Sequence, residues 1–486
     1  MKIYAINPPF IRGFCRGVRG CGEASRGGTL YYPIWLAYAT GILEQSHDVR
    51  LVDAQALKFS SDDVINDLCD YDPDLCVIET NFSSLSNDLK IANDIKIQSD
   101  TLVCMVGPPV SQYTENILNE GVDLAARYEY DITIKEIADN YTCLEDLRTI
   151  RGISYRLDEE IIHNEDRDLT TSEDLDQIPF VSTVYKKHLN ISDYFLSSSL
   201  YPMIQIFSGR GCPNNCTFCS WPITFSGRKY RVRSVENVID EFSYIENNVS
   251  YVKEIFIEDD TFTINKERVK DFCQFYLERG LKIAWSCNAR ANTLDLDTMK
   301  LMKKANCRML IAGYESGSND ILNNIKKNVS VDDMRTFSTA AKKAHLMVHG
   351  DFIIGLPGEN KTTISLTKDL ILELKPEILQ VLVPQPIPGT ELYSWLKDRG
   401  YLVTDDPVEY LDSDGFQKSV VSYPELSSDE MINAANKILR DYYISIDYIF
   451  LALNQIIRRN SFDEIKRLWH SARLFTKYAY RRMEEI

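Results

Sequence analysis

The sequence predicts an α/β protein: a doubly wound parallel sheet, then a partial barrel of six strand–helix units, then a helical C-terminal part. Short β-rich runs alternate with helical stretches through most of the chain. The 486 residues also exceed the size at which one hydrophobic core keeps growing, so we expect several domains. We place these domains at residues 1–140, 141–200 (a linker), 201–398 and 399–486.

The composition is that of a globular protein with a strong negative charge. Hydrophobic residues make up 44% and charged residues 26%, and the formal net charge is −17. Nucleic-acid binding relies on concentrated Lys and Arg, so this charge argues against a nucleic-acid partner. The chain has no apolar run of membrane-spanning length and no signal peptide, so we expect a cytoplasmic protein without a membrane span.

Five β-rich runs in residues 1–140 predict a parallel sheet covered by helices. The runs are 2–6, 48–52, 75–79, 101–106 and 122–126, and the predicted helices are 34–45, 62–69, 87–98 and 113–119. A doubly wound sheet binds its ligands beyond the carboxyl ends of its strands, so the loops there are candidate sites. These loops contain Pro8 and Pro9, Ser83 and Ser84, Gly107 and Pro108, and Tyr128 and Glu129.

Cys212, Cys216 and Cys219 stand at a C-x3-C-x2-C spacing just after a strand-like run at 203–206. A structural zinc site takes four ligands, whereas an iron–sulfur cubane held by thiolates can leave one iron for another ligand. Three thiolates therefore suggest a 4Fe-4S cluster with one open iron. The nine other cysteines form no second C-x2-C group, and we expect them to be reduced and mostly buried.

With Phe218 as the aromatic residue before Cys219, this loop resembles the signature of the radical S-adenosylmethionine (SAM) family. The resemblance implies that Cys212, Cys216 and Cys219 hold the cluster and that the open iron chelates SAM. It also implies that an external one-electron reductant, of the flavodoxin or ferredoxin type, starts the cleavage of SAM to a 5′-deoxyadenosyl radical.

Six strands are predicted between residues 203 and about 395, too few for a closed eight-fold barrel. They are 203–206, 254–257, 283–286, 309–313, 348–354 and 378–383. The motifs at their carboxyl ends resemble those of the radical SAM family. The resemblance implies that Asp259 or Asp260 binds the SAM ammonium group and that Arg290 binds the carboxylate. It also places Glu315 and Ser316 at the ribose or methionyl group and Gly355 near adenine. An acidic helix-capping turn and a surface arginine are the alternatives for the aspartates and Arg290.

The first domain resembles the Rossmann-like cobalamin-binding domain that precedes some radical SAM cores. The resemblance implies cobalamin contacts by Pro8, Pro9, Ser83, Ser84, Gly107, Pro108, Tyr128 and Glu129. The D-x-H-x-x-G motif is absent, so we expect the lower face of the cobalt to lack a histidine. Residues 128–131 also replace the usual Gly-Glu-x-Glu. A cofactor-free substrate or assembly module is the alternative.

Two further patterns belong to the second half of the chain. His345 and His349 are four residues apart, but strand entry near 348 breaks the helical spacing, so we expect packed or solvated histidines. Ser427 and Glu430 form a capping box that opens a helix over 431–459, and a second helix follows over 463–485. The aromatic-rich run 442–451 predicts core packing, with the lining of a lipid-like substrate cavity as the alternative.

Together these patterns predict a cobalamin-dependent radical SAM enzyme that methylates an unactivated carbon of a small-molecule or lipid-like intermediate. A cyclase, ring-contracting or oxidising enzyme with the same cofactors is the alternative, because the opening motifs and the C-terminal helices look similar to the hopanoid and tetrapyrrole branch. A tRNA methylthiotransferase would need three more cluster cysteines and a basic tail. A non-catalytic iron–sulfur or zinc scaffold would not cleave SAM.

Overall fold

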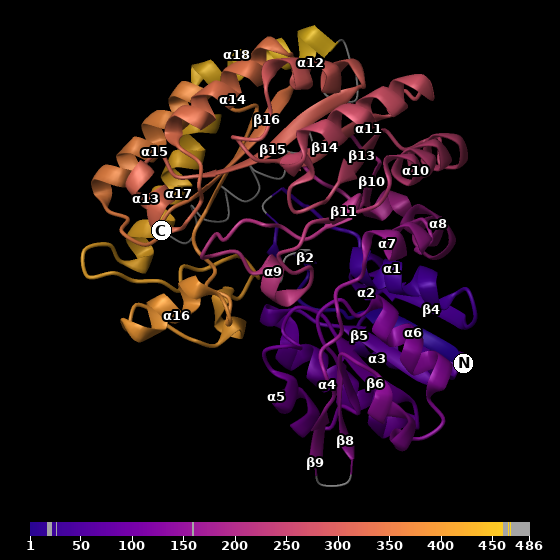
Figure 1. The fold of residues 1–486 in the computed structure, drawn as a ribbon. Coiled ribbons are helices and arrows are strands. Elements are labelled where there is room, and N and C mark those ends of the chain that lie inside the picture. Colours follow the sequence, from indigo (N-terminus) through magenta and orange to yellow (C-terminus); the bar gives the residue numbers. More distant parts are fainter. Residues whose placement is uncertain (17–21, 26, 158–159, 460–464, 466, 468–486) are drawn as a thin grey trace.

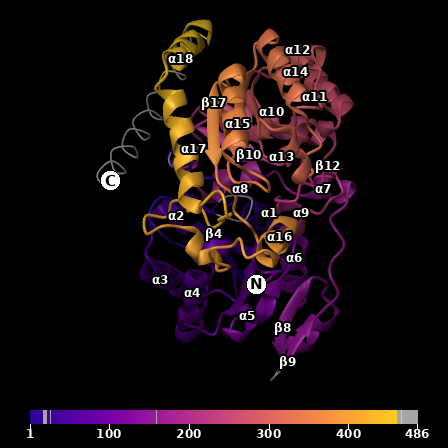
Figure 2. The same cartoon turned by 90° about the vertical axis from the view of Figure 1, so that its left-hand side faces the viewer.

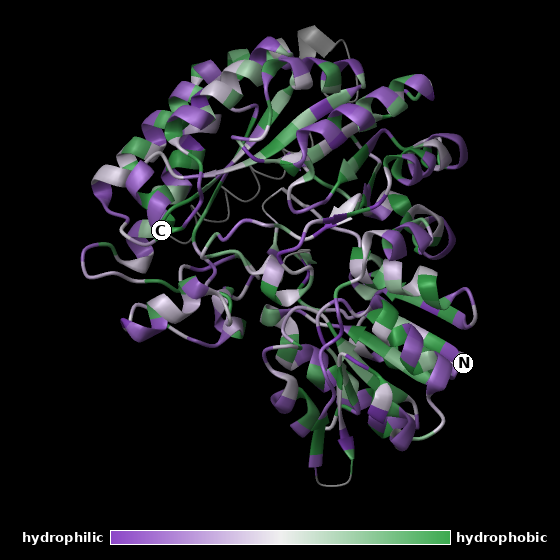
Figure 3. Cartoon of the chain, viewed as in Figure 1, coloured by the Kyte–Doolittle hydropathy of each residue, from purple (hydrophilic) through white to green (hydrophobic). Residues whose placement is uncertain are grey.

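The computed structural model describes residues 1–16, 22–25, 27–157, 160–459, 465 and 467, and it contains two large sheets, one mainly and one wholly parallel (Figure 1). Two short hairpins lie where the two sheets approach each other: β2 (Phe14–Cys15) with β3 (Glu23–Ala24), and β11 (Gly209–Arg210) with β12 (Arg231–Val232). Figure 3 shows hydrophobic residues concentrated on the strands and on the helix sides that face them. None of the described helices is both long and apolar enough to cross a bilayer.

The first sheet has seven strands in the order β4-β1-β5-β6-β7-β8-β9. Its parallel strands confirm the five predicted runs: β1 (Lys2–Asn7), β4 (Asp48–Asp53), β5 (Leu75–Glu79), β6 (Leu102–Val106) and β7 (Leu124–Ala126). Because β1 has β4 on one side and β5 on the other, the strand order reverses there. The topological switch point, where such sheets bind ligands, therefore lies between the carboxyl ends of β1 and β5.

Alternate residues of β1 face two different cores, as a doubly wound sheet requires. Ile3 and Ala5 join the core that contains α1 and α6, whereas Tyr4 and Ile6 join the core under α3 and α4. The predicted helices are confirmed within a few residues. The helices of this part are α1 (Ile34–Leu43), α2 (Ala54–Leu57), α3 (Ser61–Tyr71), α4 (Leu85–Gln98), α5 (Thr114–Asn119) and α6 (Asp131–Asn140).

Every residue of α1 is buried. One side of the helix packs on the first sheet and α6, and another packs on α8 (Val181–His188). Tyr32, just before α1, donates its backbone N–H to Gln205 at 3.0 Å, and the Tyr38 hydroxyl accepts the N–H of Phe207 at 3.0 Å. A helix that is apolar on all sides needs partners on all sides, so α1 is shared by both halves of the molecule.

Residues 141–200, which we expected to be a linker with a small hairpin, extend the first sheet. Strands β8 (Ile153–Leu157) and β9 (Glu160–His163) pair antiparallel beyond β7. Two helices follow, α7 (Ser172–Gln177) and α8. The segment thus contributes strands and helices to the packed structure as well as connecting the two sheets.

The second sheet has six parallel strands in chain order, and all six were predicted. They are β10 (Met203–Ile206), β13 (Glu254–Ile257), β14 (Ala284–Ala289), β15 (Cys307–Glu315), β16 (Met347–Ile353) and β17 (Ile378–Leu382). The associated helices are α9 (Trp221–Thr224), α10 (Val235–Asn248), α11 (Lys266–Glu278), α12 (Leu296–Lys304), α13 (Asn319–Asn324), α14 (Val331–Lys343), α15 (Lys361–Leu374) and α16 (Glu391–Asp398). The longer helices among them cover the outer side of the sheet (Figure 1).

The C-terminal helix predicted over 431–459 is divided in two. α17 (Ser428–Tyr443) begins at the predicted capping box, in which Ser427 and Glu430 bond each other's backbone, and α18 (Ile446–Arg459) begins after Ser445. The Ser445 hydroxyl accepts the N–H of Tyr448 at 3.1 Å and so caps the second helix. α17 runs alongside β17 and α18 continues beyond it (Figure 2), and the predicted helix over 463–485 falls almost wholly outside the described residues.

Part of the aromatic run at 442–451 is core packing, as expected. The Tyr442 hydroxyl donates to the Pro376 carbonyl, and the Tyr443 hydroxyl donates to the Leu379 carbonyl at 2.8 Å. Tyr448 packs against both tyrosine rings. Phe450, in contrast, is 62% exposed, so the run does not lie wholly inside the core.

Buried ion pairs join the two halves of the molecule. Arg231 donates to both oxygens of Glu129 at 2.7 and 2.9 Å, and Arg210 donates to Asp131 at 2.6 Å. All four side chains are at most 3% exposed. The Arg210 guanidinium also lies 4.4 Å from the ring centroid of Trp35. A buried charge is costly without its partner, so these pairs hold the halves in one relative position.

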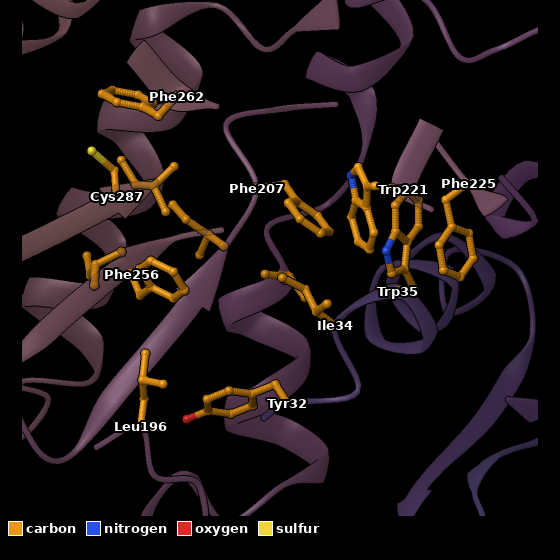
Figure 4. Packing of buried hydrophobic residues seen from close by; sticks show 14 of the residues in the cluster. Tyr32, Ile34, Trp35, Leu196, Phe207, Trp221, Phe225, Phe256, Phe262 and Cys287 are labelled. Atoms are coloured by element: carbon orange, nitrogen blue, oxygen red, sulfur yellow. The ribbon is translucent and has the colours of Figure 1, made fainter. Parts of the chain in front are cut away.

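Aromatic side chains from both halves pack beside these ion pairs. Trp35 of α1 stacks on Phe225 with ring centroids 4.6 Å apart, and it lies 5.3 Å from Phe207. Trp221 contacts the same rings from the loop after the cysteines. Figure 4 shows these four rings side by side. The apolar contact therefore spans the boundary between the halves.

Replacing Glu129 by Gln should destabilise the protein strongly, because Arg231 would stay buried without a counter-charge. We expect the free energy of unfolding to fall by about 3 kcal/mol, measured by urea unfolding followed by circular dichroism. Glu391→Gln is the matched control: Glu391 pairs with Lys326 on the surface, and its loss should cost less than about 1 kcal/mol. Equal effects of the two variants would contradict the structural role of Glu129.

Candidate cofactor sites

The three signature cysteines lie on the loop after β10. Cys216 is buried, and Cys212 and Cys219 are partly buried. Of the cysteines outside the signature, the structure buries six as expected: Cys15, Cys76, Cys104, Cys273, Cys287 and Cys307. Cys69 and Cys143 are exposed, and Cys21 falls outside the described residues.

Hydrogen-bond donors surround the signature thiols. Asn214 donates its amide to the Cys212 sulfur at 3.2 Å, and the Arg290 Nη1 lies 3.9 Å from the Cys216 sulfur. Hydrogen bonds to the sulfurs are among the features that tune an iron–sulfur cluster. In the described part of the chain, no three His, Cys, Asp or Glu side chains are spaced to hold a single metal ion. A cubane takes one thiolate per iron, so it needs no such grouping.

Arg290 directly follows β14 and is 6% exposed. Its Nη2 has no hydrogen-bond partner among the described residues. A buried guanidinium N–H without an acceptor is costly, and a ligand carboxylate would satisfy it. Of the two predicted alternatives, a surface arginine is therefore wrong, and the geometry fits an anion-binding role next to the cysteines.

The two candidate aspartates after β13 differ in their surroundings. Asp259 is 1% exposed and accepts the Ser208 N–H at 2.6 Å, the Ser208 hydroxyl at 2.6 Å and the Gly209 N–H at 3.0 Å. Burial raises the pKa of Asp259 despite these bonds. Asp260 is partly exposed and accepts the Ser226 hydroxyl at 3.1 Å. Asp259 therefore fixes the start of the signature loop, and Asp260 is the more accessible of the two carboxylates.

Glu315 and Ser316, at the end of β15, are both engaged by the chain. The Lys327 ammonium donates to Glu315 Oε1 at 2.6 Å, and both side chains are less than 10% exposed. Lys327 also lies 5.9 Å from the ring centroid of Phe218, which packs on α13. Ser316 accepts the N–H of Ser318 at 3.2 Å. Lys326 and Lys327 stand out in the sequence only as a local basic patch of the kind usually found on a solvated or anion-binding surface, whereas Lys327 is buried between these two distant motifs.

Gly355 follows β16 with a φ of +109°, a conformation that favours glycine. A Cβ atom there would lie 2.5 Å from the sulfur of Met431 on α17. The Gly355 carbonyl accepts the Tyr423 hydroxyl at 2.8 Å. The C-terminal part thus packs directly on this loop, and the predicted ligand would share the loop with it.

The two histidines differ in their exposure to solvent. His345 is exposed, whereas His349 is 8% exposed and lies on β16, so both are solvated or packed as expected. His349 Nε2 lies 3.2 Å from Asp351 Oδ1, two residues further along the same face of the strand. Asp351 is in register with Gln380 of β17. The opposite face of β16 carries Phe352, which packs outward on Tyr314, so the His349 face points into the barrel.

A cavity lies at the switch point of the first sheet. It encloses about 410 Å³ of empty space that includes open solvent. Its lining residues come from the carboxyl ends of β1, β5 and β6, from the start of α1 and from the loop after the cysteines: Asn7, Arg16, Tyr31, Tyr32, Pro33, Ile34, Trp35, Glu79, Thr80, Asn81, Pro108 and Phe225. The predicted cobalamin residue Pro108 is among them, and the cavity touches both halves of the molecule.

The Pro8–Pro9 and Ser83–Ser84 loops are tied together by residues that sequence reasoning missed. Arg16 donates to Asp88 at 2.7 and 2.8 Å and to the Pro8 carbonyl at 2.9 Å. Asn87 donates to the Pro9 carbonyl at 2.9 Å. The Ser84 hydroxyl donates to Asp88 at 2.7 Å, and the neighbouring Ser83 hydroxyl has no partner among the described residues.

On the loops after β6 and β7, three residues that were predicted to contact cobalamin make contacts within the chain. Gly107 has a φ of +116°, and a Cβ there would lie 2.4 Å from the Thr80 carbonyl oxygen. The Tyr128 N–H donates to the Ser111 hydroxyl at 3.2 Å. Both oxygens of Glu129 accept from Arg231, so its carboxylate faces the second half of the molecule.

Glu79, at the end of β5, is the titratable group of the cavity wall. Burial raises its pKa to about 7, and the hydrogen bond from the Tyr130 hydroxyl at 3.0 Å opposes part of that rise. The side chain can therefore exist in both protonation states near neutral pH. Its place at the carboxyl end of a central strand is a signal that the sequence already contained.

Comparison with known proteins agrees with this geometry. Residues 206–371 match the model of the Radical SAM superfamily. An uncharacterized methyltransferase of Pyrococcus horikoshii is 31% identical over 452 residues, which cover 92% of each chain. This chain belongs to the radical SAM superfamily. The anaerobic magnesium-protoporphyrin IX monomethyl ester cyclase of Cereibacter sphaeroides is 25% identical over 384 residues, which cover 76% of this radical SAM chain and 60% of the cyclase.

A solved structure shares the fold of this radical SAM enzyme over both halves. It is that of TsrM, a radical SAM methyltransferase from Kitasatospora setae, with cobalamin and a [4Fe-4S] cluster bound. The TM-score is 0.68 with 14% sequence identity, and the match covers 92% of this chain and 89% of TsrM. At that identity the likeness concerns the fold.

Glu79→Gln should change how stability depends on pH. The folded state raises the pKa of Glu79, so the protonated form is favoured, and the wild type should lose stability as the pH rises from about 5 to about 8. Gln cannot ionise, so the free energy of unfolding of the variant should rise relative to wild type over that range. Urea unfolding at several pH values measures it. A difference that stays flat, as expected for the exposed control Glu120→Gln, would contradict the buried setting of Glu79.

Proposed function

We propose that this enzyme is a cobalamin-dependent radical SAM methyltransferase that methylates an unactivated carbon of a small-molecule or lipid-like substrate. The observation that carries the proposal is the cavity at the switch point, which is lined both by the first sheet and by Phe225 from the loop after the cysteines. Two reactive groups that must act on one carbon need such a shared space. The name of the Pyrococcus relative supports methyl transfer.

The proposal assigns a role to each part of the chain. Residues 1–140 form the main part of the Rossmann-like cobalamin-binding domain, and residues 141–200 add β8 and β9 to its sheet and connect it to a partial (β/α)6 radical SAM barrel at 201–398. Residues 399–486 form the helical C-terminal domain. The two separate sheets, each built around parallel strands, support this division.

The residues present fit the implied groups. Cys212, Cys216 and Cys219 would hold the cluster, and Arg290 Nη2, which has no partner among the described residues, would donate to the SAM carboxylate. Asp260 would take the SAM ammonium group, because Asp259 is already saturated by three donors. When bound, the cluster would supply the electron that cleaves SAM, and cobalamin would carry the methyl group.

The inner face of β16 is where we place the substrate. His349 and Asp351 point into the barrel, and neither ring nitrogen of His349 nor Oδ1 of Asp351 makes a well-formed hydrogen bond among the described residues. These groups would hold a polar group of the substrate while its reacting carbon faces the radical. They would exclude bulk water by their burial.

Cyclisation or oxidation without methyl transfer is the second candidate, because the Cereibacter relative is named a cyclase. The deciding experiment uses anaerobically reconstituted protein with hydroxocobalamin, a chemical reductant and SAM that carries a trideuterated methyl group. Methyl transfer predicts about four irons per chain, 5′-deoxyadenosine, and recovered cobalamin that has gained the labelled methyl group. Cleavage of SAM with unlabelled cobalamin would overturn the methyltransferase proposal and favour the second candidate.

The two aspartates after β13 should respond differently to the same substitution. Asp260→Asn should reduce 5′-deoxyadenosine formation at least about tenfold, because a charge-assisted contact to SAM is lost, and should change the free energy of unfolding less than Asp259→Asn does. Asp259→Asn should lower the free energy of unfolding by about 1–3 kcal/mol, because its hydrogen bonds to Ser208 and Gly209 are weakened. Liquid chromatography of the product and urea unfolding measure the two effects. The reverse pattern would assign the SAM contact to Asp259.

A further inference from the structure

The walls of the switch-point cavity contain polar atoms that the protein itself leaves without partners. They are Asn7 Oδ1, Trp35 Nε1 and Arg16 Nε, and each has no hydrogen-bond partner in the part of the chain that the structure describes. Asn7 is 3% exposed, Trp35 is 1% exposed, and the Arg16 side chain is 7% exposed. Buried polar groups are normally paired, so three orphans around one cavity indicate a missing ligand.

The rest of each side chain is held in place. Asn7 donates its amide N–H to Asp53 at 2.8 Å, which leaves its oxygen as the free atom. Trp35 is clamped between Phe225 and the Arg210 guanidinium. Arg16 uses both terminal nitrogens on Asp88, which leaves Nε. The residues that line the cavity therefore include one fixed acceptor and two fixed donors.

This set of partners has a definite chemical complement. A primary amide presents a carbonyl oxygen, which can accept from two donors, and an NH2 group, which donates. A carboxylate would accept from Trp35 and Arg16 but would set a second oxygen against Asn7 Oδ1 and near the Glu79 carboxylate. A hydroxyl would fill the sites only in part. The match is therefore best for a primary amide.

We propose that this cavity binds a primary amide on the edge of the corrin ring, with Asn7 accepting from its NH2 group and Trp35 and Arg16 donating to its oxygen. The inference rests on the proposed function, because it takes cobalamin as the ligand of the first sheet. Cobalamin carries several primary amides around its ring. An amide-bearing substrate has the same chemistry, and the experiment distinguishes the two sources.

The experiment measures binding, not turnover. The full-length protein is titrated anaerobically with hydroxocobalamin, and with each purified monocarboxylate in which one ring amide is hydrolysed; visible absorbance of the protein-bound fraction gives the affinity. We expect one monocarboxylate to bind about tenfold more weakly than hydroxocobalamin and the other isomers to bind about as well, because one isomer loses the donor to Asn7.

Trp35→Phe tests the protein side of the same contact. It keeps an aromatic ring between Phe225 and Arg210 but removes the N–H, so hydroxocobalamin should bind about five- to tenfold more weakly. The penalty for the sensitive monocarboxylate should shrink in this variant, because both changes disrupt one interaction. Trp395→Phe on α16 makes the same substitution outside the cavity and should leave both affinities unchanged.

The outcomes distinguish the assignment of cobalamin as the ligand from the assignment of its amide contact. Failure of the wild type to bind hydroxocobalamin would overturn the cobalamin assignment together with this inference. Tight binding of hydroxocobalamin, with all monocarboxylates and Trp35→Phe behaving alike, would overturn the inference alone and leave the cavity to a substrate amide. The ligand series needs no variant, so a folding defect in Trp35→Phe would not decide the result.

Discussion

The pairing of Arg210 and Arg231 with Asp131 and Glu129 is the constraint on which the rest of the structure depends. Both arginines lie in the β11–β12 hairpin, and Arg210 comes two residues before the first signature cysteine. Glu129 lies in the loop after β7, and Asp131 is the first residue of α6. These ion pairs fix the carboxyl edge of the first sheet relative to the signature loop, because moving one against the other would leave a buried charge without its partner. A ligand at that edge and a cluster on that loop would thereby be held in one relative geometry.

The two halves nevertheless differ in which polar groups stabilise the fold and which are placed to bind a ligand. At the carboxyl ends of the second sheet, Asp259 and Glu315 accept hydrogen bonds from the chain, while Asp260 is more accessible and Arg290 Nη2 has no partner among the described residues. At the edge of the first sheet, residues with atoms that are unpartnered within the described ranges line a cavity. Fixed neighbours around a few open groups are the arrangement expected of a site that must not reorganise during reaction.

The sequence predicted the elements better than the roles of individual side chains. All the parallel strands were found, because each is an apolar run bounded by turn residues, and the cysteine spacing was specific enough to name the family. The roles of Asp259 and Asp260 were not separable, because their difference lies in Ser208 and Gly209, fifty residues away in the chain. Glu129 was assigned to a cofactor because no residue near it in the sequence indicates its ion pair with Arg231. The split between α17 and α18 depends on one serine hydroxyl.

The complete burial of α1 has a consequence for how such enzymes can diversify. A helix with one exposed side can accept new neighbours by changing only the face that meets them, whereas α1 meets the first sheet on one side and the second half of the molecule on another. Its residues are therefore constrained by both parts at once. The two halves are therefore not interchangeable modules. A chimera that took residues 1–140 from a relative would contain an α1 helix that fits the second half of a different protein. Changes at the inner face of the barrel are a more accessible route to new substrates.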